Sequence, residues 1–174
     1  MIDPQLTGKR ILITGSSSGL GFAMAKALGT HGASVLITAH TPGRLKIAVN
    51  ELLLFIHQQR GKITNIYMNH ETMKRKGFIP YGPSRAGAES LSMIMTEDLR
   101  SENVDVNILL PGGATETGMI RDEMKQSLPA NFTLLSPEII AEPILFLASD
   151  QSNGITGQRI IATQFHEWKQ KLNY

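Results

Sequence analysis

The chain alternates between short apolar runs and longer segments in which apolar residues recur at helical spacing. Runs rich in β-branched residues predict strands at 10–14, 33–39, 62–68, 104–110 and 155–163. Apolar residues three or four apart predict helices at 22–28, 44–59, 81–101 and 136–148. The stretches without a sustained period predict a loop at 69–80, a loop or lid at 114–135 and a polar tail after 163.

The order of these elements predicts the fold class. Strands that alternate with helices are typical of a parallel sheet with helices on both faces. A chain of 174 residues with 41% hydrophobic and 18% charged residues has the size and composition of one globular domain. We therefore expect a single α/β domain over residues 1–174.

Composition and charge exclude several classes of function. The net charge is only +2 and the 17 Lys and Arg residues are scattered, so we expect no nucleic-acid partner. The chain has no cysteine and its five histidines lack a metal-binding spacing, so we expect no metal site. It also lacks a long apolar stretch and an N-terminal targeting signal, which predicts no membrane association and a cytoplasmic location.

A glycine-rich turn joins the first predicted strand to the helix that follows it. The turn reads Thr14-Gly15-Ser-Ser-Ser-Gly19-Leu20-Gly21. Gly15 permits the sharp turn, Gly19 lets the backbone approach a pyrophosphate, and Gly21 allows the helix to pack closely on the sheet. The helix N-terminus adds unpaired N–H groups and the positive end of a dipole. This position between strand and helix predicts a dinucleotide-binding loop.

The turn resembles the glycine motif of the short-chain dehydrogenase/reductase family, and three further motifs follow in the family's order. These are Tyr81-Gly-Pro-Ser-Arg85 in place of Tyr-x-x-x-Lys, Pro111-Gly112, and Ile155-Thr156-Gly157-Gln158. The resemblance covers residues 8–163 apart from one gap. It implies a Rossmann-like, doubly wound parallel sheet with a reduced number of strands and helices on both faces.

By resemblance, the chain is an oxidoreductase that uses NAD(P) to transfer a hydride between a small carbonyl compound and an alcohol. Tyr81 is the implied catalytic acid/base, and Arg85 is the implied cation that promotes its ionisation. The implied cofactor-binding residues are Gly15, Ser17, Ser18, Gly19, Leu20, Gly21, His40, Tyr81, Arg85, Pro111, Gly112, Thr115 and Thr117. Either of the two threonines could bind the nicotinamide carboxamide, and the sequence leaves that choice open.

The coenzyme and the oligomeric state are also implied by resemblance. An acidic residue after the second strand would favour NAD, whereas this chain has His40 there with Arg44 close by, which favours NADP. The helix from Tyr81 and the helix before Lys62 correspond to family helices that pair across a dimer interface. A homodimer or homotetramer is therefore expected.

The chain departs from the family in its middle. Only residues 40–61 separate the second strand from the third, whereas the family places two further strand-helix units there, including a helix with an active-site Asn. Either the strand at 62–68 now pairs directly with the strand at 10–14, or an edge is left open. An open edge favours oligomerisation or aggregation.

The active site also departs from the family. The family's substrate-binding Ser stands 13 residues before the Tyr, where this chain has Met68, and a thioether cannot donate that hydrogen bond. Asn69 and Thr72 are candidates to replace it. Arg85 keeps the charge of the family's Lys but does not release a proton.

These observations leave two hypotheses about function. The first is a hydride-transferring oxidoreductase, and the second is a catalytically impaired relative that serves as a nucleotide-binding or interaction protein. A third alternative, a truncated product without a stable fold, predicts that cooperative thermal unfolding would be absent.

Overall fold

The structure is a computed structural model that describes residues 5–13, 16, 18–37, 60–74, 76–120, 122–126, 128–129 and 131–172. The chain divides into two compact units, each described by itself. Unit 1 comprises Met1–Glu51 and Gly113–Gln151, and unit 2 comprises Leu52–Gly112 and Ser152–Tyr174. The expectation of a single domain stays a prediction. The predicted helix at 44–59 lies outside the described residues.

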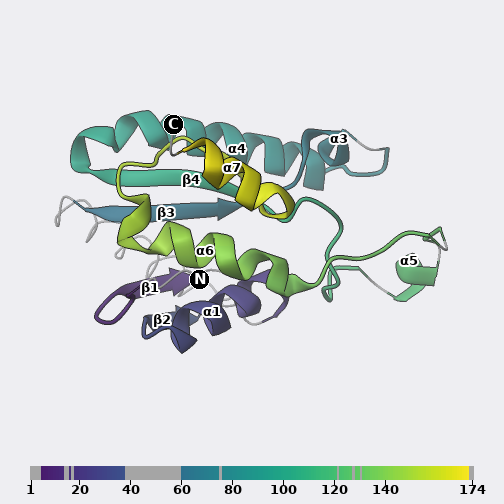
Figure 1. The fold of residues 1–174 in the computed structure, drawn as a ribbon. Helices are drawn as coiled ribbons and strands as arrows, with labels where there is room; N and C mark the ends of the chain where they lie inside the picture. Colours follow the sequence, from purple (N-terminus) through teal and green to yellow (C-terminus); the bar gives the residue numbers. More distant parts are fainter. Residues whose placement is uncertain are drawn as a thin grey trace. The chain divides into compact units, whose positions relative to one another are not determined.

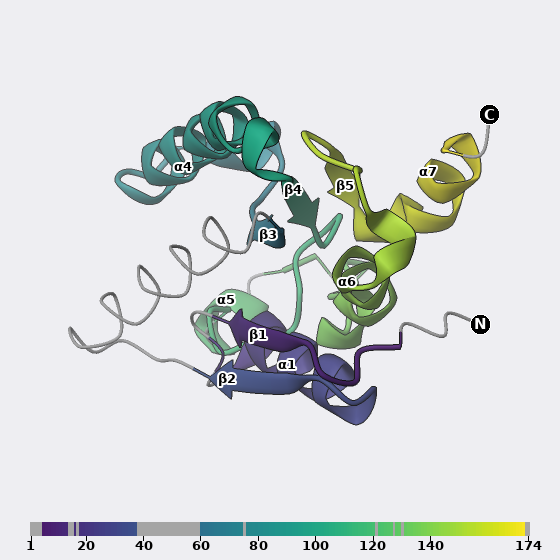
Figure 2. The same cartoon turned by 90° about the vertical axis from the view of Figure 1, so that its left-hand side faces the viewer.

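Unit 1 contains the predicted strand-helix-strand segment. Strand β1 (Arg10–Ile13) pairs in parallel with β2 (Ser34–Ile37), and α1 (Gly19–Thr30) connects them (Figure 2). Ala23, Met24 and Leu28 are buried on α1, which packs against α6. The remaining elements of this unit are α5 (Asp122–Gln126), the 3-10 helix η2 (Pro137–Ile140) and α6 (Ala141–Ala148), followed at the boundary by η3 (Asp150–Ser152).

The helix predicted at 136–148 begins as a 3-10 turn and continues as α6. The Ser136 side chain accepts a hydrogen bond from the Glu138 N–H, and Pro137 occupies the first turn, as the sequence predicts. The segment at 114–135, predicted as a loop or lid, contains the short helix α5. Five residues are too few for the apolar period on which helix prediction depends.

Unit 2 is built on a three-stranded parallel sheet in the order β3-β4-β5. The strands are β3 (Gly61–Ile66), β4 (Val104–Leu110) and β5 (Arg159–Ile161). The helices are α3 (His70–Met73), α4 (Tyr81–Asp98), η1 (Arg100–Glu102), η4 (Ala162–Gln164) and α7 (Phe165–Lys171). Figure 1 shows α4 lying along β3 and β4, with α3 beside the end where α4 begins.

Three predictions in unit 2 need correction. The loop predicted at 69–80 contains α3, because Asn69 caps a single helical turn. The last strand begins at Arg159 and is shorter than the predicted 155–163. Before Arg159, side-chain hydrogen bonds replace part of the backbone ladder: the Asn107 amide bonds the Ile155 carbonyl and the Gln158 N–H, and the Thr156 hydroxyl accepts from the Val106 N–H. The tail predicted as polar forms α7, which is anchored by the buried ring of Phe165.

The helix α4 presents its apolar stripe outward. Its buried residues are the small or polar Gly82, Glu89, Ser92 and Thr96. Three large apolar side chains are exposed instead, Leu91 by 56%, Met93 by 64% and Ile94 by 55%, while Met95 is half-buried. Helical spacing of apolar residues therefore identified the helix without identifying the face that packs on the sheet, because hydrogen bonds satisfy the buried face.

The chain has a Rossmann-like α/β fold with a reduced number of strands. All described strand pairs are parallel. Among the described residues, β1 pairs with β2 in one sheet and β3 pairs with β4 in the other. The direct pairing of the strands at 10–14 and 62–68 stays a prediction. None of the helices that the structure describes is long and apolar enough to cross a membrane.

The packing of α3 on α4 generates a prediction about stability. A Cβ added at Gly82 would lie 2.1 Å from the Met73 carbonyl oxygen. We expect Gly82→Ala to lower the free energy of unfolding by about 1–3 kcal/mol, because one helix must shift. Gly87→Ala on the same helix meets no described atom within 4 Å and should gain roughly 0.5–1 kcal/mol. Urea unfolding measures both, and equal stabilities would contradict the close contact.

Candidate functional site

The start of α1 has the features of an anion-binding helix end. Ser18 is the N-cap residue, with extended backbone and no side-chain capping bond, and the first turn contains no acidic residue. Ser18 therefore does not occupy the first N–H groups of the helix, and the helix dipole favours a negative charge there. Ser16 is fully buried and its hydroxyl donates to the Ile13 carbonyl at 2.8 Å, which ties the turn to β1. Gly15 and Ser17 lie outside the described residues.

Two glycines of the motif serve different purposes. Gly19 has φ +56°, which favours glycine, and a Cβ there would lie 3.1 Å from Thr117 Cγ2. Gly21 is buried on α1 next to Leu20, which is half-buried. The structure thus adds a turn conformation at Gly19, and Gly21 is buried on the helix. The predicted approach of Gly19 to a pyrophosphate stays a prediction, and Gly15, to which the sequence assigns the sharp turn, is not among the described residues.

The structure brings Thr117, and not Thr115, to the glycine turn. Thr117 packs its methyl group over Gly19, and its hydroxyl accepts a hydrogen bond from the Met119 N–H at 3.4 Å. Thr115 is buried, donates to the Gly113 carbonyl at 3.3 Å, and forms a β-bridge with Leu135. The geometry of unit 1 therefore favours Thr117 as the residue that contacts a ligand at this turn.

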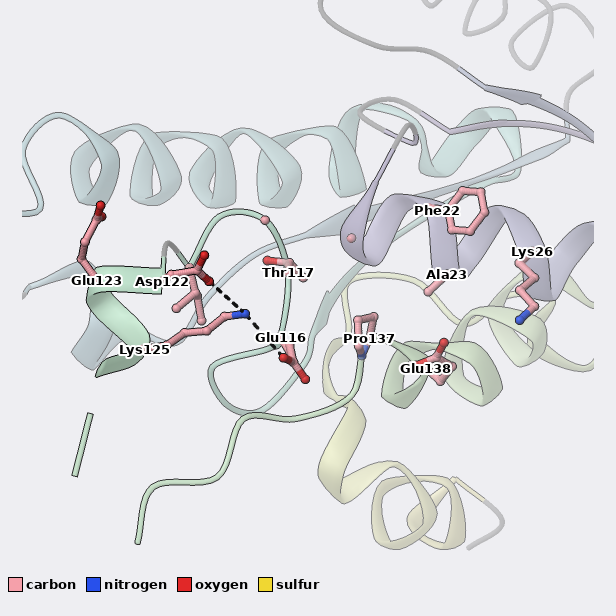
Figure 3. Close-up of a pocket in the computed structure, with 13 residues that line it drawn as sticks. Phe22, Ala23, Lys26, Glu116, Thr117, Asp122, Glu123, Lys125, Pro137 and Glu138 are labelled. Carbon is pink, nitrogen blue, oxygen red and sulfur yellow. Dashed lines mark hydrogen bonds and ion pairs between the residues drawn. The ribbon is translucent and has the colours of Figure 1, made fainter. Parts of the chain in front are cut away.

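A cleft of about 690 Å³ opens beside the same turn within unit 1. Figure 3 shows α1 on one side, with Phe22 and Lys26, and the α5 segment on the other. Lys125 holds that segment together, with its Nζ 3.5 Å from Glu116 and 3.7 Å from Asp122. The predicted lid residues therefore line a cleft of mixed charge.

Glu138 adds a negative charge to the rim of this cleft. A hydrogen bond from the Ser136 hydroxyl, together with one from its own backbone N–H, lowers the pKa of the Glu138 carboxyl below its ordinary value. This carboxylate stays ionised at neutral pH, and any ligand in the cleft must tolerate it.

Tyr81 and Arg85 lie one turn apart at the start of α4 in unit 2. The guanidinium carbon of Arg85 lies 5.1 Å from the centroid of the Tyr81 ring, which is a cation–π distance. Arg85 Nε is buried and has no hydrogen-bond partner among the described residues. The predicted pair is therefore in contact, and Arg85 retains an unused donor.

After β3, the two candidate substitutes for the family's Ser lie next to each other, and their role stays a prediction. Met68 is half-buried there. Asn69 Oδ1 accepts from the Thr72 N–H at 2.7 Å and from the Thr72 hydroxyl at 2.5 Å, so the two candidate substitutes bond to each other. Tyr67 directs its hydroxyl away, to the Ala88 carbonyl at 2.6 Å.

Pro111 and Gly112 end β4 as predicted. Gly112 has φ +96°, and a Cβ there would lie 2.1 Å from the Thr163 hydroxyl oxygen. This turn therefore requires glycine, both for its positive φ and because a Cβ would clash with the Thr163 side chain. His40, the residue predicted to select the coenzyme, lies outside the described part of the chain.

Sequence reasoning missed the ion pair between the buried Glu89 and the half-buried Arg159. Glu89 Oε1 lies 2.8 Å from Arg159 Nε, under the helix that carries Tyr81. The spacing of Arg85 and Glu89, four residues apart, was an available signal for Glu89. Arg159 comes from a strand far along the chain, and the sequence carries no comparable signal for it.

Gly19 and Gly118 both line the cleft and allow a matched test of the turn. We expect Gly19→Ala to lower the free energy of unfolding by about 1–2 kcal/mol, because alanine is strained at φ +56°. A Cβ at Gly118 meets no described atom within 4 Å, so Gly118→Ala should have little effect. Thermal unfolding of the two variants gives the comparison. A Gly19→Ala variant as stable as Gly118→Ala would exclude the strained turn.

Comparison with protein families gives two matches along the chain. A family model described as enoyl-(acyl carrier protein) reductase matches residues 45–163, and one described as short chain dehydrogenase matches residues 9–53. The two ranges overlap at 45–53, within the shortened connection between the second and third predicted strands. The chain is therefore covered by two family models that meet where the sequence indicates a missing middle.

Similar curated proteins include 3-oxoacyl-[acyl-carrier-protein] reductases. The one from Thermotoga maritima is 30% identical over 136 residues, which are 72% of this chain and 53% of that protein. The one from Aquifex aeolicus is 28% identical over 130 residues, 72% of this chain and 52% of that protein. The chain spans about half the length of these two relatives. The match to the one from Rickettsia bellii runs over 234 positions at 24% identity, with 92% of this chain and 96% of that protein covered.

Solved structures with similar folds include a gluconate 5-dehydrogenase from Burkholderia cenocepacia in complex with NADP and tartrate. It has a TM-score of 0.75 and 18% identity, and the match covers 94% of this chain and 97% of that one. A short chain dehydrogenase/reductase family protein has a TM-score of 0.74 and 20% identity, with 93% and 99% covered. At these identities the similarity establishes the fold.

Proposed function

This chain belongs to the short-chain dehydrogenase/reductase family, and we propose that it is an NAD(P)-dependent oxidoreductase that interconverts a carbonyl and an alcohol. The observation that carries the proposal is the contact between Tyr81 and Arg85 at the start of α4. A tyrosine with a permanent cation against its ring, in the family's position, is placed to act as acid/base. The uncapped N-terminus of α1 supports a binding site for the dinucleotide phosphates.

The residues present fit a dinucleotide in three respects. The first turn of α1 carries no acidic residue to repel a phosphate, and Gly19 has the positive φ of +56° that a tight glycine turn requires. Arg85 holds its guanidinium against the Tyr81 ring, in the position where the family's cation meets the ribose. When bound in its reduced form, the nicotinamide supplies the hydride.

Within the protein, Tyr81 donates a proton from its hydroxyl to the carbonyl oxygen as that oxygen gains negative charge. Arg85 stabilises the tyrosinate that results, because its guanidinium stays charged, but it does not resupply the proton. Met68 offers no donor to the same oxygen. We therefore propose an enzyme in which proton donation rests on Tyr81 and the carbonyl is weakly polarised.

NADP is the proposed coenzyme, and a homodimer or homotetramer is the proposed assembly. Two observations support NADP over NAD. The similar gluconate 5-dehydrogenase has NADP bound, and position 40, where an acidic residue would favour NAD, is a histidine in this chain. The exposed apolar stripe of Leu91, Met93 and Ile94 on α4 supports assembly through that helix.

A second candidate function is nucleotide binding without turnover. The specific observation in its favour is Met68 at the family's serine position, because a thioether cannot donate a hydrogen bond to a substrate oxygen. The two candidates share the dinucleotide and differ in whether a carbonyl compound is reduced.

Dinucleotide binding is tested by the thermal midpoint of the purified protein with millimolar NADPH, NADH, NADP and NAD. At about 100 times the dissociation constant, binding contributes roughly 2.7 kcal/mol, which raises the midpoint by about 5–10 °C. We expect NADPH or NADP to give the largest shift. A cooperatively unfolding protein with no shift for any of the four would exclude both candidates.

Turnover is tested by restoring the hydroxyl that the family uses. We expect Met68→Ser to raise kcat/KM for carbonyl reduction by about 10-fold or more, because the serine hydroxyl can donate to the developing oxyanion. NADPH consumption measures the rate, and Tyr81→Phe should abolish it in both backgrounds. Met93→Ser, which replaces an exposed methionine of α4, is the control. If nucleotide binds but neither wild type nor Met68→Ser turns over, the second candidate function stands.

A further inference from the structure

Glu89 is a buried carboxylate on α4, the helix that also carries Tyr81. It is 6% exposed and lies on α4, one turn after Arg85 and two turns after Tyr81. A carboxylate in this environment is costly unless it is paired and hydrogen-bonded. Its Oε1 is 2.8 Å from Arg159 Nε and 3.6 Å from His70 Nε2. Glu89 therefore joins α4 to both β5 and α3.

Arg159 continues this network to the end of β3. Its Nη2 donates to the Met68 carbonyl oxygen at 3.3 Å, while its Nε donates to Glu89. One guanidinium thus bonds both the helix with Tyr81 and the residue at the family's serine position. The rigid fork of arginine fixes the distance between these two acceptors, which a lysine could not do.

Two buried polar atoms next to this network have no hydrogen-bond partner among the described residues. The two atoms are Glu89 Oε2 and Arg85 Nε. One is an acceptor and the other a donor, and they lie four residues apart on the same helix, where side chains meet. Each leaves a buried group unsatisfied, and a bond between them would satisfy both.

We propose that Glu89 is a positioning residue for the active site, an inference that rests on the proposed function. Through Oε1 it holds Arg159 against the Met68 carbonyl, and through Oε2 it accepts a hydrogen bond from Arg85 when the dinucleotide is bound. Glu89 thereby orients the cation at Tyr81 and sets the position of the segment that begins at Met68. It acts through Arg85 and Arg159 and does not touch the substrate.

A purely structural role for Glu89 predicts different effects of substitution than a positioning role does. Replacing a buried ion pair by apolar residues of similar volume is often neutral or stabilising, so stability alone does not require Glu89 and Arg159. A positioning role requires the carboxylate itself, because only a charged acceptor orients a guanidinium strongly. Variants that retain stability but lose the carboxylate therefore separate the two roles.

The test is a double-mutant cycle read by the dissociation constant for NADPH, from its fluorescence. We expect Glu89→Gln to weaken binding by about 10-fold where Arg85 is present, as for loss of a charged hydrogen bond. In an Arg85→Met background the same change should weaken it by less than about threefold, because the group through which Glu89 acts is gone. Equal weakening in both backgrounds, or none in either, would overturn the proposal. Glu97→Gln, an exposed ion-pair member of the same helix, should leave binding unchanged.

Hydrogen exchange provides a second measurement that needs no ligand. Glu89→Gln should speed amide exchange at residues 68–73, because Arg159 is released from the Met68 carbonyl, while α6 is unaffected. Unchanged exchange at 68–73 would overturn the inference. If wild type binds no dinucleotide, the proposed function fails and this exchange measurement alone decides whether Glu89 holds the segment.

A paired replacement guards against simple unfolding of the single variant. Glu89→Leu combined with Arg159→Met removes both charges and should fold cooperatively. We expect its NADPH binding to remain at least about 10-fold weaker than that of wild type, since Arg85 still lacks its acceptor. Wild-type affinity in this stable double variant would show that Glu89 serves stability only.

Discussion

Unit 2 depends on the burial of one strand, β4, between two parallel neighbours. Val106, Leu109 and Leu110 are almost fully buried, and β3 and β5 both pair with this strand. Asn107 is buried within it and uses its amide to bond the Ile155 carbonyl and the Gln158 N–H. The chain that returns as β5 is therefore placed by side-chain bonds before the ladder begins. Everything that β5 carries, including Arg159, takes its position from β4.

The contact between α4 and this sheet combines hydrogen bonds with the apolar packing of Ala88 against Tyr67, Ile108 and Leu110. The Tyr67 hydroxyl bonds the Ala88 carbonyl and contacts Ser92, and Asn65 donates to Ser92 at 2.8 Å. Thr96 donates to the Val106 carbonyl at 3.4 Å. Hydrogen bonds constrain direction as well as distance, so they hold the helix in register with the strands. Tyr81 and Arg85 at its first turn inherit that placement, while Leu91, Met93 and Ile94 of the same helix are exposed.

The motifs on either side of the shortened middle keep their local geometry. The glycine turn in unit 1 and the Tyr81 helix in unit 2 each have the local geometry that their residues require. What is altered is the support around them: a methionine stands at the family's serine position, and arginine replaces lysine. Arg159 bonds both Glu89 and the Met68 carbonyl, and Glu89 lies one helical turn after Arg85.

The sequence by itself determined the elements and the motifs. The strands near 10–14 and 104–110, the helix from Tyr81 and the glycine turn follow from local patterns, because apolar period, capping and glycine conformation act over a few residues. The sequence also identified the contact of Tyr81 with Arg85, since residues four apart share one face of a helix.

Only the tertiary structure decided how distant residues combine. It showed that α4 turns its apolar residues outward, that Thr117 reaches Gly19, and that Asn69 and Thr72 bond each other. It also joined Arg159 to Glu89 and Met68 across three elements. Such contacts depend on how strands are ordered and how helices pack, and the period of a local sequence pattern carries no information about a partner many residues away.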